Sequence, residues 1–154
     1  MKSTQEAHHT VDIANGFQLE HPRIFVPWGV SRGELESLFQ GLGLQPVGDG
    51  FHLPGCTSLG GLSHSLGFSF ARASGKLSEI AMAVPDVSIE ESYQQLQQHF
   101  VATFGPPNKT LPGKEKEEFP HHIWLLPGVR IEHCVHEHFG PAERIFITRT
   151  DEVS

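Results

Sequence analysis

The sequence has little cysteine and no long apolar run. Its 154 residues include only two cysteines, Cys56 and Cys134, too few for the disulfide framework of a small secreted scaffold. Residues 1–9 are polar and lack the apolar core of a signal peptide. No stretch approaches the roughly 20 apolar residues that a membrane-spanning helix needs. We therefore expect a cytoplasmic protein with both cysteines reduced and no membrane partner.

Basic residues are also scarce. The chain has 11 Lys and Arg against 18 Asp and Glu, a formal charge of -7, and its pI is about 5.8. Nucleic-acid binding needs a basic face that releases counterions, so this composition argues against a nucleic-acid partner. A basic protein partner fits the charge better.

One acidic stretch is a candidate surface for such a partner. Residues 77–99 contain no Lys or Arg. We take as candidate partner-binding residues the four carboxylates of this stretch and one tryptophan next to a helix start: Glu79, Asp86, Glu90, Glu91 and Trp28. An exposed tryptophan is a common anchor at interfaces. The alternatives are that the charge run is a solvated face and that the tryptophan packs in the core or staples the helix entry.

Recognised metal and catalytic motifs are missing, although histidine is abundant. The chain has 11 histidines, but none stands in a His-Glu-x-x-His spacing, and there is no Cys-x-x-Cys. If residues 129–138 form a strand, alternation places Glu132, Cys134, His136 and His138 on one face. This pattern suggests an alternative function, a zinc-dependent hydrolase that uses Glu132, His136 and His138. The other interpretation is solvated or hydrogen-bonded strand histidines, and the leading interpretation needs no cofactor.

Cys56 is the one candidate nucleophile, and the case for it is weak. It lies in Pro54-Gly55-Cys56-Thr57, which reads as a turn that exposes the thiol to activation by a histidine nearby in space. No flanking signature or helix N-terminus supports an activated thiol. We therefore expect a turn or buried thiol and no catalytic residue.

Two helices are predicted, and the same start signal precedes each of them. A short apolar segment runs into Pro, Val and a capping Ser, first at Ser31 and then at Ser88, and a Glu three residues later completes a capping box. The first helix shows apolar residues at i, i+3, i+4 and i+7, and glycines end it: Leu35, Leu38, Phe39 and Leu42, then Gly41 and Gly43. The second runs from Ser88 to about Phe104, with a glutamine- and glutamate-rich outer side.

Strand patterns follow each helix. They are expected at residues 51–53 with a turn at Pro54-Gly55, at 64–70 and 77–84 as a hairpin, and at 122–126, 129–137 and 144–149. A short strand precedes the first helix at 23–27, residues 1–20 read as a flexible N-terminal arm, and 108–118 as a mobile loop. We predict one α+β domain over residues 21–150. It would be a two-layer sandwich with two helices on one face of an antiparallel sheet built from two pseudo-repeated helix–meander units.

This order of elements resembles small bacterial cytosolic proteins of the toxin-immunity type, and also tandem-repeat inhibitor proteins. The resembling segments are Val30-Ser31-x-x-Glu34-Leu35, Gly75-Lys76-Leu77-Ser78-Glu79-Ile80, Tyr93-x-x-Leu96, Phe104-Gly105-Pro106-Pro107, and Trp124 leading to Val129-Arg130-Ile131. The resemblance implies a non-enzymatic immunity protein that neutralises a cognate bacterial toxin by direct binding. It carries no residue-level site, because such families place their contacts on variable surface positions. A secretion or effector chaperone is the alternative from a related class.

Overall fold

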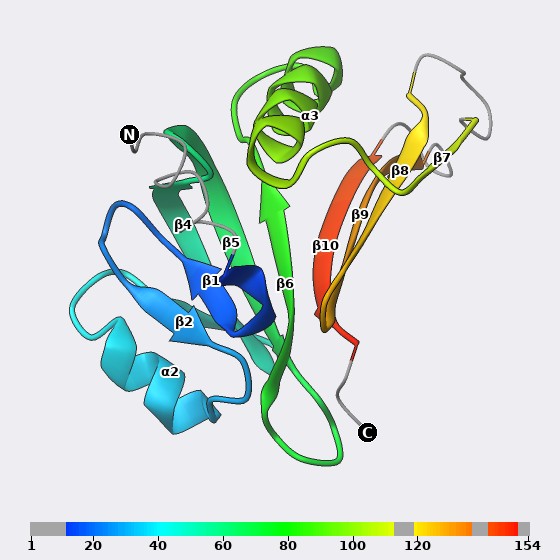
Figure 1. Cartoon of the computed structure of the whole chain (residues 1–154). Coiled ribbons are helices and arrows are strands. Elements are labelled where there is room, and N and C mark those ends of the chain that lie inside the picture. Colours follow the sequence, from blue (N-terminus) through cyan, green and yellow to red (C-terminus); the bar gives the residue numbers. More distant parts are fainter. Residues whose placement is uncertain (1–11, 113–118, 137–141, 151–154) are drawn as a thin grey trace, which may run out of the picture.

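The computed structural model describes residues 12–112, 119–136 and 142–150 (Figure 1). A 3-10 turn η1 (Asp12–Ala14) and strands β1 (Gly16–Gln18) and β2 (Phe25–Pro27) precede helix α2 (Arg32–Leu38). Strands β3 (Gln45–Val47), β4 (Gly50–Ser58), β5 (Leu62–Phe70) and β6 (Leu77–Ala83) follow. Helix α3 (Ile89–Phe104) then precedes β7 (Lys109–Leu111), β8 (His121–Leu126), β9 (Val129–His136) and β10 (Ala142–Arg149). The α+β class is confirmed.

The main sheet consists of two meanders joined at their last strands. Its eight strands lie in the order β3-β4-β5-β6-β10-β9-β8-β7, and all its strand pairs are antiparallel. Four consecutive strands follow α2, and four follow α3. The joint is β6 against β10, with Ile80 opposite Ile147. From either edge of the sheet to the joint, the strands therefore follow one another in sequence order, β3 to β6 from one edge and β7 to β10 from the other.

A single row of apolar side chains crosses six of the strands. Its members are register partners from one strand to the next: Phe51, Phe68, Ile80, Ile147, Ile131 and Trp124. All six are buried. Because direct cross-strand neighbours share one face of a sheet, this row marks the face on which the core lies.

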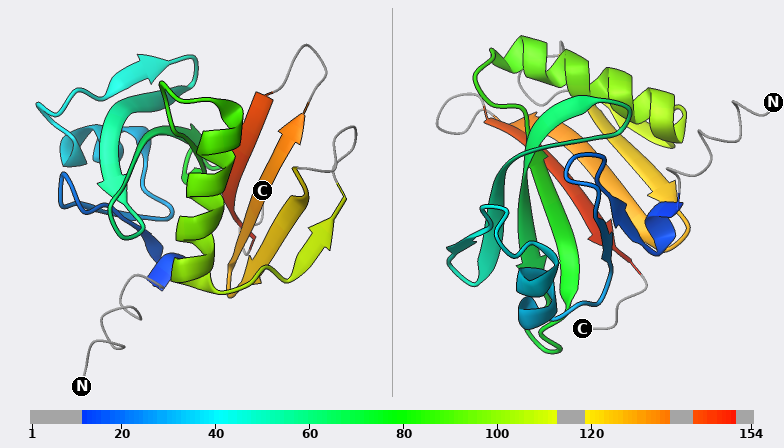
Figure 2. Two further views of the ribbon diagram at one scale, coloured as in Figure 1. Left: turned by 90° about the horizontal axis from the view of Figure 1, so that it is seen from above. Right: turned by 90° about the vertical axis from the view of Figure 1, so that its left-hand side faces the viewer.

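Both helices contact that row. Helix α2 lies against the first half of the sheet, and α3 lies between the two halves, where it contacts both β5 and β10. The ring centroid of Phe39, at the end of α2, lies 5.6 Å from that of Phe68. The ring of Phe100 in α3 lies 5.4 Å from that of Trp124. Figure 2 shows α3 at one end of the molecule and α2 near the other. The stricter description as a two-layer sandwich stays a prediction, because the small β1–β2 sheet also contributes Phe17 and Val26 to the core.

The helix starts follow the sequence pattern, with one difference between them. Ser31 and Glu34 form a complete capping box, in which the Ser31 N–H donates to Glu34 Oε1 at 2.8 Å. Ser88 accepts from the Glu91 N–H at 3.1 Å, but the Glu91 carboxylate accepts instead from Gln95 Nε2 at 3.4 Å. The second box is therefore only half formed.

Helix α2 is shorter than predicted. It spans seven residues and ends at Leu38, and Leu38 and Leu42 are exposed. Gly41 and Gly43 adopt φ angles of +78° and +87°, which glycine adopts without steric cost. These glycines turn the chain before the last predicted apolar position can reach the core.

The predicted boundary of the N-terminal arm is wrong for residues 12–20. Ile13, Phe17 and Leu19 are buried in the core, and β1 pairs with β2. The Trp28 indole donates to the Ile13 carbonyl at 2.8 Å and fixes this segment in place. Three apolar residues in a mostly polar stretch are enough to anchor it. Residues 1–11 lie outside the described residues.

Two loop assignments also need correction. The turn expected at Pro54-Gly55 is absent, because β4 continues through it with a register shift against β5 between Leu53 and Cys56. Proline is tolerated there because β3 covers β4 only at residues 50–52. The loop expected at 108–118 contains the edge strand β7, and residues 113–118 of that loop are not described. None of the described helices is long and apolar enough to cross a membrane.

Candidate functional site

A cavity of about 770 Å³ opens between the β4–β5 hairpin and the turn that joins β6 to α3. Residues 54–57 and 63–64 line it from the hairpin, and residues 84–87 line it from the turn. Residues 21–22, Leu42 and Gln95 complete the lining. A volume of this size is typical of ligand sites, which range over roughly 300–1,000 Å³. We take it as the candidate functional site.

Cys56 and His64 line this cavity, and the buried Ser58 lies beside His64. The Cys56 Sγ is 3.7 Å from His64 Nδ1, and the Ser58 Oγ is 2.5 Å from His64 Nε2. His64 Nδ1 is also 3.0 Å from the Ser65 carbonyl. A neutral imidazole satisfies this geometry, with Nδ1–H donating to the carbonyl and Nε2 accepting from the serine hydroxyl.

This cluster is chemically quiet. Burial raises the pKa of the Cys56 thiol to about 12 and lowers the pKa of His64. A reactive cysteine needs a depressed pKa and a cationic neighbour, and here both shifts favour the neutral forms. The expectation of a buried thiol agrees with the position of Cys56, which is 8 % exposed.

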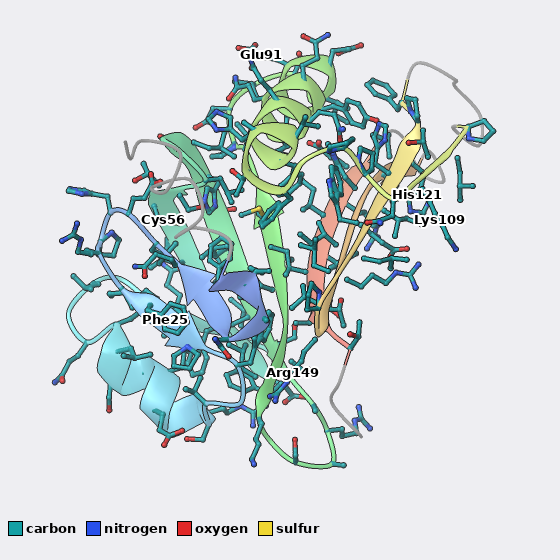
Figure 3. The ribbon with its side chains drawn as sticks, viewed as in Figure 1. Phe25, Cys56, Glu91, Lys109, His121 and Arg149 are labelled. Carbon is teal, nitrogen blue, oxygen red and sulfur yellow. The ribbon has the colours of Figure 1, made fainter. Side chains whose placement is uncertain are left out.

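The acidic candidates divide into two groups. Asp86 is exposed at φ +66° and lines the cavity. Glu90 and Glu91 are exposed in the first turn of α3, and Glu91 projects from the outer end of that helix in Figure 3. The bond from Gln95 holds Glu91 next to a residue of the cavity lining. Glu79 is not part of this group.

Glu79 and Trp28 lie elsewhere. Glu79 is half-buried on β6 opposite Ser69 and Thr148, and burial together with the Glu132 charge raises its pKa. Trp28 is only 8 % exposed, so its ring offers a partner little surface. The second interpretation of Trp28, a core residue, describes its position.

The residues of the alternative zinc site are only partly described. Glu132 lies on β9, with its Oε2 2.7 Å from Arg130 Nη2 and 3.5 Å from His121 Nε2. The backbone of His136 pairs with Ala142, its side chain is not described, and His138 lies outside the described residues. Within residues 12–112, 119–136 and 142–150, no group of three His, Cys, Asp or Glu side chains is placed to hold a metal ion.

A buried polar network was missed from the sequence. His133 is fully buried, with Nε2 2.5 Å from Glu143 Oε2 and Nδ1 2.8 Å from Gln97 Oε1. The Ser92 hydroxyl donates to the other carboxylate oxygen of Glu143, and the Tyr93 ring lies 4.3 Å from the imidazole. This network ties α3 to β9 and β10.

The charge of His133 is set by two opposed effects. Acceptor oxygens beside both ring nitrogens favour the imidazolium, whereas burial lowers the pKa of His133 more than the Glu143 carboxylate raises it. The sequence placed His133 correctly on the face of Ile131 and Val135. It gave Gln97 to the wet side of α3, and nothing local signals that Glu143, on the next strand, completes the network.

A second groove, of about 680 Å³, lies between β2 and α2 and includes Phe25, Val30 and Leu38. Of its polar lining residues, Ser31 and Glu34 already bond to each other's backbone in the capping box, and the third is the exposed Ser37. We take the first cavity as the stronger candidate, because its exposed carboxylate, Asp86, does not serve as a helix cap, whereas Glu34 in the second groove does.

Comparison with known proteins identifies no family. No protein-family model matches the sequence, and a search of curated proteins finds no match. Among solved structures, the chain is similar to a DUF4309 family protein, YjgB, from Bacillus subtilis subsp. subtilis str. 168, with a TM-score of 0.46 and 15 % sequence identity. The similarity covers 78 % of each chain. It carries no argument about function.

Proposed function

We propose that this protein acts by binding another protein and has no catalytic activity of its own. The observation that carries the proposal is the pairing of exposed apolar side chains with an exposed carboxylate around one cavity. Leu42 is 45 % exposed and Val87 is 37 % exposed, and both line the cavity with Asp86. The neutral Cys56–His64 pair in its lining supports a binding role over nucleophilic catalysis.

The partner that suits this surface is basic. Asp86 lies in the turn before α3 and Glu90 and Glu91 in the first turn of that helix, and all three, here called the acidic turn, are exposed. The whole chain carries a formal charge of -7. Such a field raises association rates with a cationic partner. Apolar contacts at Leu42 and Val87 would then slow dissociation, which is where most differences in affinity arise.

The finer proposal is that of an immunity protein, a cytoplasmic inhibitor that neutralises a bacterial toxin by direct binding. Its support is the acidic composition together with the resemblance of the helix and strand motifs to proteins of that type. In this proposal the toxin is basic near its active site, and binding blocks that site.

Affinity purification from the native cell is the first test. The tagged protein is purified, co-eluting proteins are identified by mass spectrometry, and the same sample undergoes elemental analysis. The proposal expects a stoichiometric protein partner whose own activity falls when the complex forms. Stoichiometric zinc without a partner would contradict it, and so would a dimer that holds an unfolded secretion substrate, the result expected of a chaperone.

The role of the acidic turn is tested with the reconstituted complex. Asp86→Asn removes one charge and keeps a residue that tolerates positive φ, and Glu91→Gln removes a second. Both variants should slow association, with a smaller salt dependence than the wild type. Glu36→Gln is the matched control, because Glu36 is equally exposed but lies on α2. Equal rates for all four proteins would remove the acidic turn from the interface.

A further inference from the structure

Among the described residues, no strand pairs with the outer edge of β4 where it borders the cavity. Strand β3 pairs with β4 only at Gly50, Phe51 and His52. Further along, Thr57 is bonded to the N-terminal segment, with its N–H 3.0 Å from the His21 carbonyl and its carbonyl 2.9 Å from the Glu20 N–H. Residues 53–56 lie between these two covered stretches and contain the register shift. An exposed strand edge is a site at which another chain can pair.

Gly55 lies in the middle of this open stretch. It is exposed, and in the described part of the chain a Cβ built on it would meet no heavy atom within 4 Å. The backbone of another chain can therefore come close to β4 at this point. Glycine inside a strand commonly marks such an approach.

The opposite wall of the cavity supplies contacts for side chains. Val87 presents an exposed apolar group there and Asp86 a carboxylate, and Leu42, from the loop between α2 and β3, adds a second exposed apolar group to the lining. Among the described residues that line the cavity there is no Lys or Arg. A volume of about 770 Å³ holds more than one side chain, so a short length of extended chain fits better than a single protruding residue.

We infer that the cavity holds an extended segment of the partner protein whose side chains alternate between apolar and basic. Its main chain runs along residues 53–56 of β4 in the manner of an added strand, without a bond from Pro54, which has no N–H. An apolar side chain contacts Val87 and Leu42, and a Lys or Arg approaches Asp86. This inference rests on the proposed function, since it describes how a basic protein partner would bind.

The test uses a synthetic peptide. Acetyl-(Val-Lys)₄-amide is the probe, acetyl-(Val-Glu)₄-amide is its charge-reversed control, and binding is followed by amide shifts of the ¹⁵N-labelled full-length protein. The Val–Lys peptide should shift the amides of residues 53–57 and 84–87. The Val–Glu peptide should bind about tenfold more weakly or worse, because the Asp86 carboxylate in the cavity lining repels its glutamates. No binding of the Val–Lys peptide up to millimolar concentration, or shifts that map to another surface, would overturn the inference.

Two substitutions locate the peptide further. Gly55→Trp fills the open stretch and should abolish binding. Gly33→Trp is its control, since a Cβ at Gly33 also meets no heavy atom within 4 Å in the described part of the chain, but Gly33 lies on α2. Val87→Ser should weaken binding severalfold, whereas Val101→Ser, at a similarly exposed valine of α3, should not. Peptide binding that survives Gly55→Trp and Val87→Ser would contradict the assignment.

The inference and the proposed function fail in different ways. If the partner purified from cells binds the Gly55→Trp variant as tightly as the wild type, the cavity beside β4 is not the docking site, although the protein is still a binding protein. If the Val–Lys peptide binds in this cavity but no partner is inhibited by the protein, the assignment of the cavity holds and the inhibitor function is lost.

Discussion

Ile80 and Ile147 face each other across the joint between the two helix–meander halves, and both are completely buried. Each also pairs with a buried residue of its own half, Phe68 for Ile80 and Ile131 for Ile147. The joint is therefore the middle of a continuous apolar row. Neither half can separate from the other without exposing it.

Truncation at this joint should destabilise the whole domain. Ile147→Ala removes buried methyl groups and is expected to lower the free energy of unfolding by about 3 kcal/mol. Urea denaturation followed by fluorescence and circular dichroism measures the change. Leu125→Ala, at a side chain 47 % exposed on β8, should cost less than about 0.5 kcal/mol. Two separate transitions in either protein would show that the halves unfold independently.

Periodic patterns predicted the elements that lie flat on the core. Helix α3 and strands β5, β6 and β9 came out close to their observed bounds, because alternating or helical burial is written directly in the residue order. The bulge in β4 and the early end of α2 were not predicted. Pro54-Gly55 signals a turn locally, and only the position of β4 at an open edge shows why a strand can pass through it.

The sites were harder to predict than the fold. The exposure of Asp86, Glu90 and Glu91 could be expected, because a charge run is local in the sequence; their role in binding stays a prediction. The cavity beside the acidic turn joins residues from six separate stretches of sequence, and the pairing of Cys56 with His64 depends on the register between β4 and β5. Glu79 belongs to the same charge run but lies on β6, away from the turn that holds Asp86. Each residue of a strand advances the chain by about 3.3 Å, so residues close in sequence can lie far apart in space.

Two glycines of β4 should respond oppositely to the same substitution. A Cβ at Gly50 would clash with the Phe68 carbonyl oxygen, so Gly50→Ala should destabilise the protein by about 2 kcal/mol. Gly55 has open space around it in the described structure, and Gly55→Ala should be neutral or stabilise by about 0.5 kcal/mol through the unfolded state. Thermal denaturation of both variants decides this, and equal losses would contradict the open edge.

The helix caps are equivalent in sequence but not in structure. Ser31→Ala removes one bond of a complete capping box and Ser88→Ala a single cap bond, and each should lower the free energy of unfolding by about 1 kcal/mol. Ser37→Ala, inside α2 and exposed, should change it by only a few tenths. The return bond adds a second test. Glu34→Ala should destabilise the protein, whereas Glu91→Ala should cost less.

Glu143 should be the most sensitive member of the buried network. Its removal leaves the Nε2 of His133 and the hydroxyl of Ser92 without their acceptor, so Glu143→Ala should cost about 3 kcal/mol. Ser92→Ala, which loses one bond, should cost about 1 kcal/mol. Arg144→Ala is the control on the neighbouring exposed residue. A loss at Glu143 no larger than that at Arg144 would mean that the network contributes nothing to stability.

Stability should fall on mild acidification, and His64 should account for part of the fall. Burial holds the pKa of His64 in the folded protein below its ordinary value of 6.5, which applies to the unfolded chain. At a pH between the folded and the unfolded pKa, the unfolded chain therefore binds a proton that the folded protein does not. The free energy of unfolding therefore rises with pH in that window. The contribution of neutral His64 to the free energy of unfolding is therefore fully present above pH 6.5 and is lost as the pH falls from 6.5 towards the lower pKa of the folded protein.

The measurement is the free energy of unfolding from about pH 7.5 to 5.5 in the wild type and in His64→Asn. The variant should be less stable at the upper pH, because it lacks the bond to Ser58, and its slope against pH should be smaller. Burial also lowers the pKa of His122 and His133, so a slope should remain. Glu79, whose pKa is raised, acts in the opposite direction, and Glu79→Gln should steepen the slope towards the lower pH. Identical slopes in His64→Asn and the wild type would show that His64 is protonated equally in the folded and unfolded states.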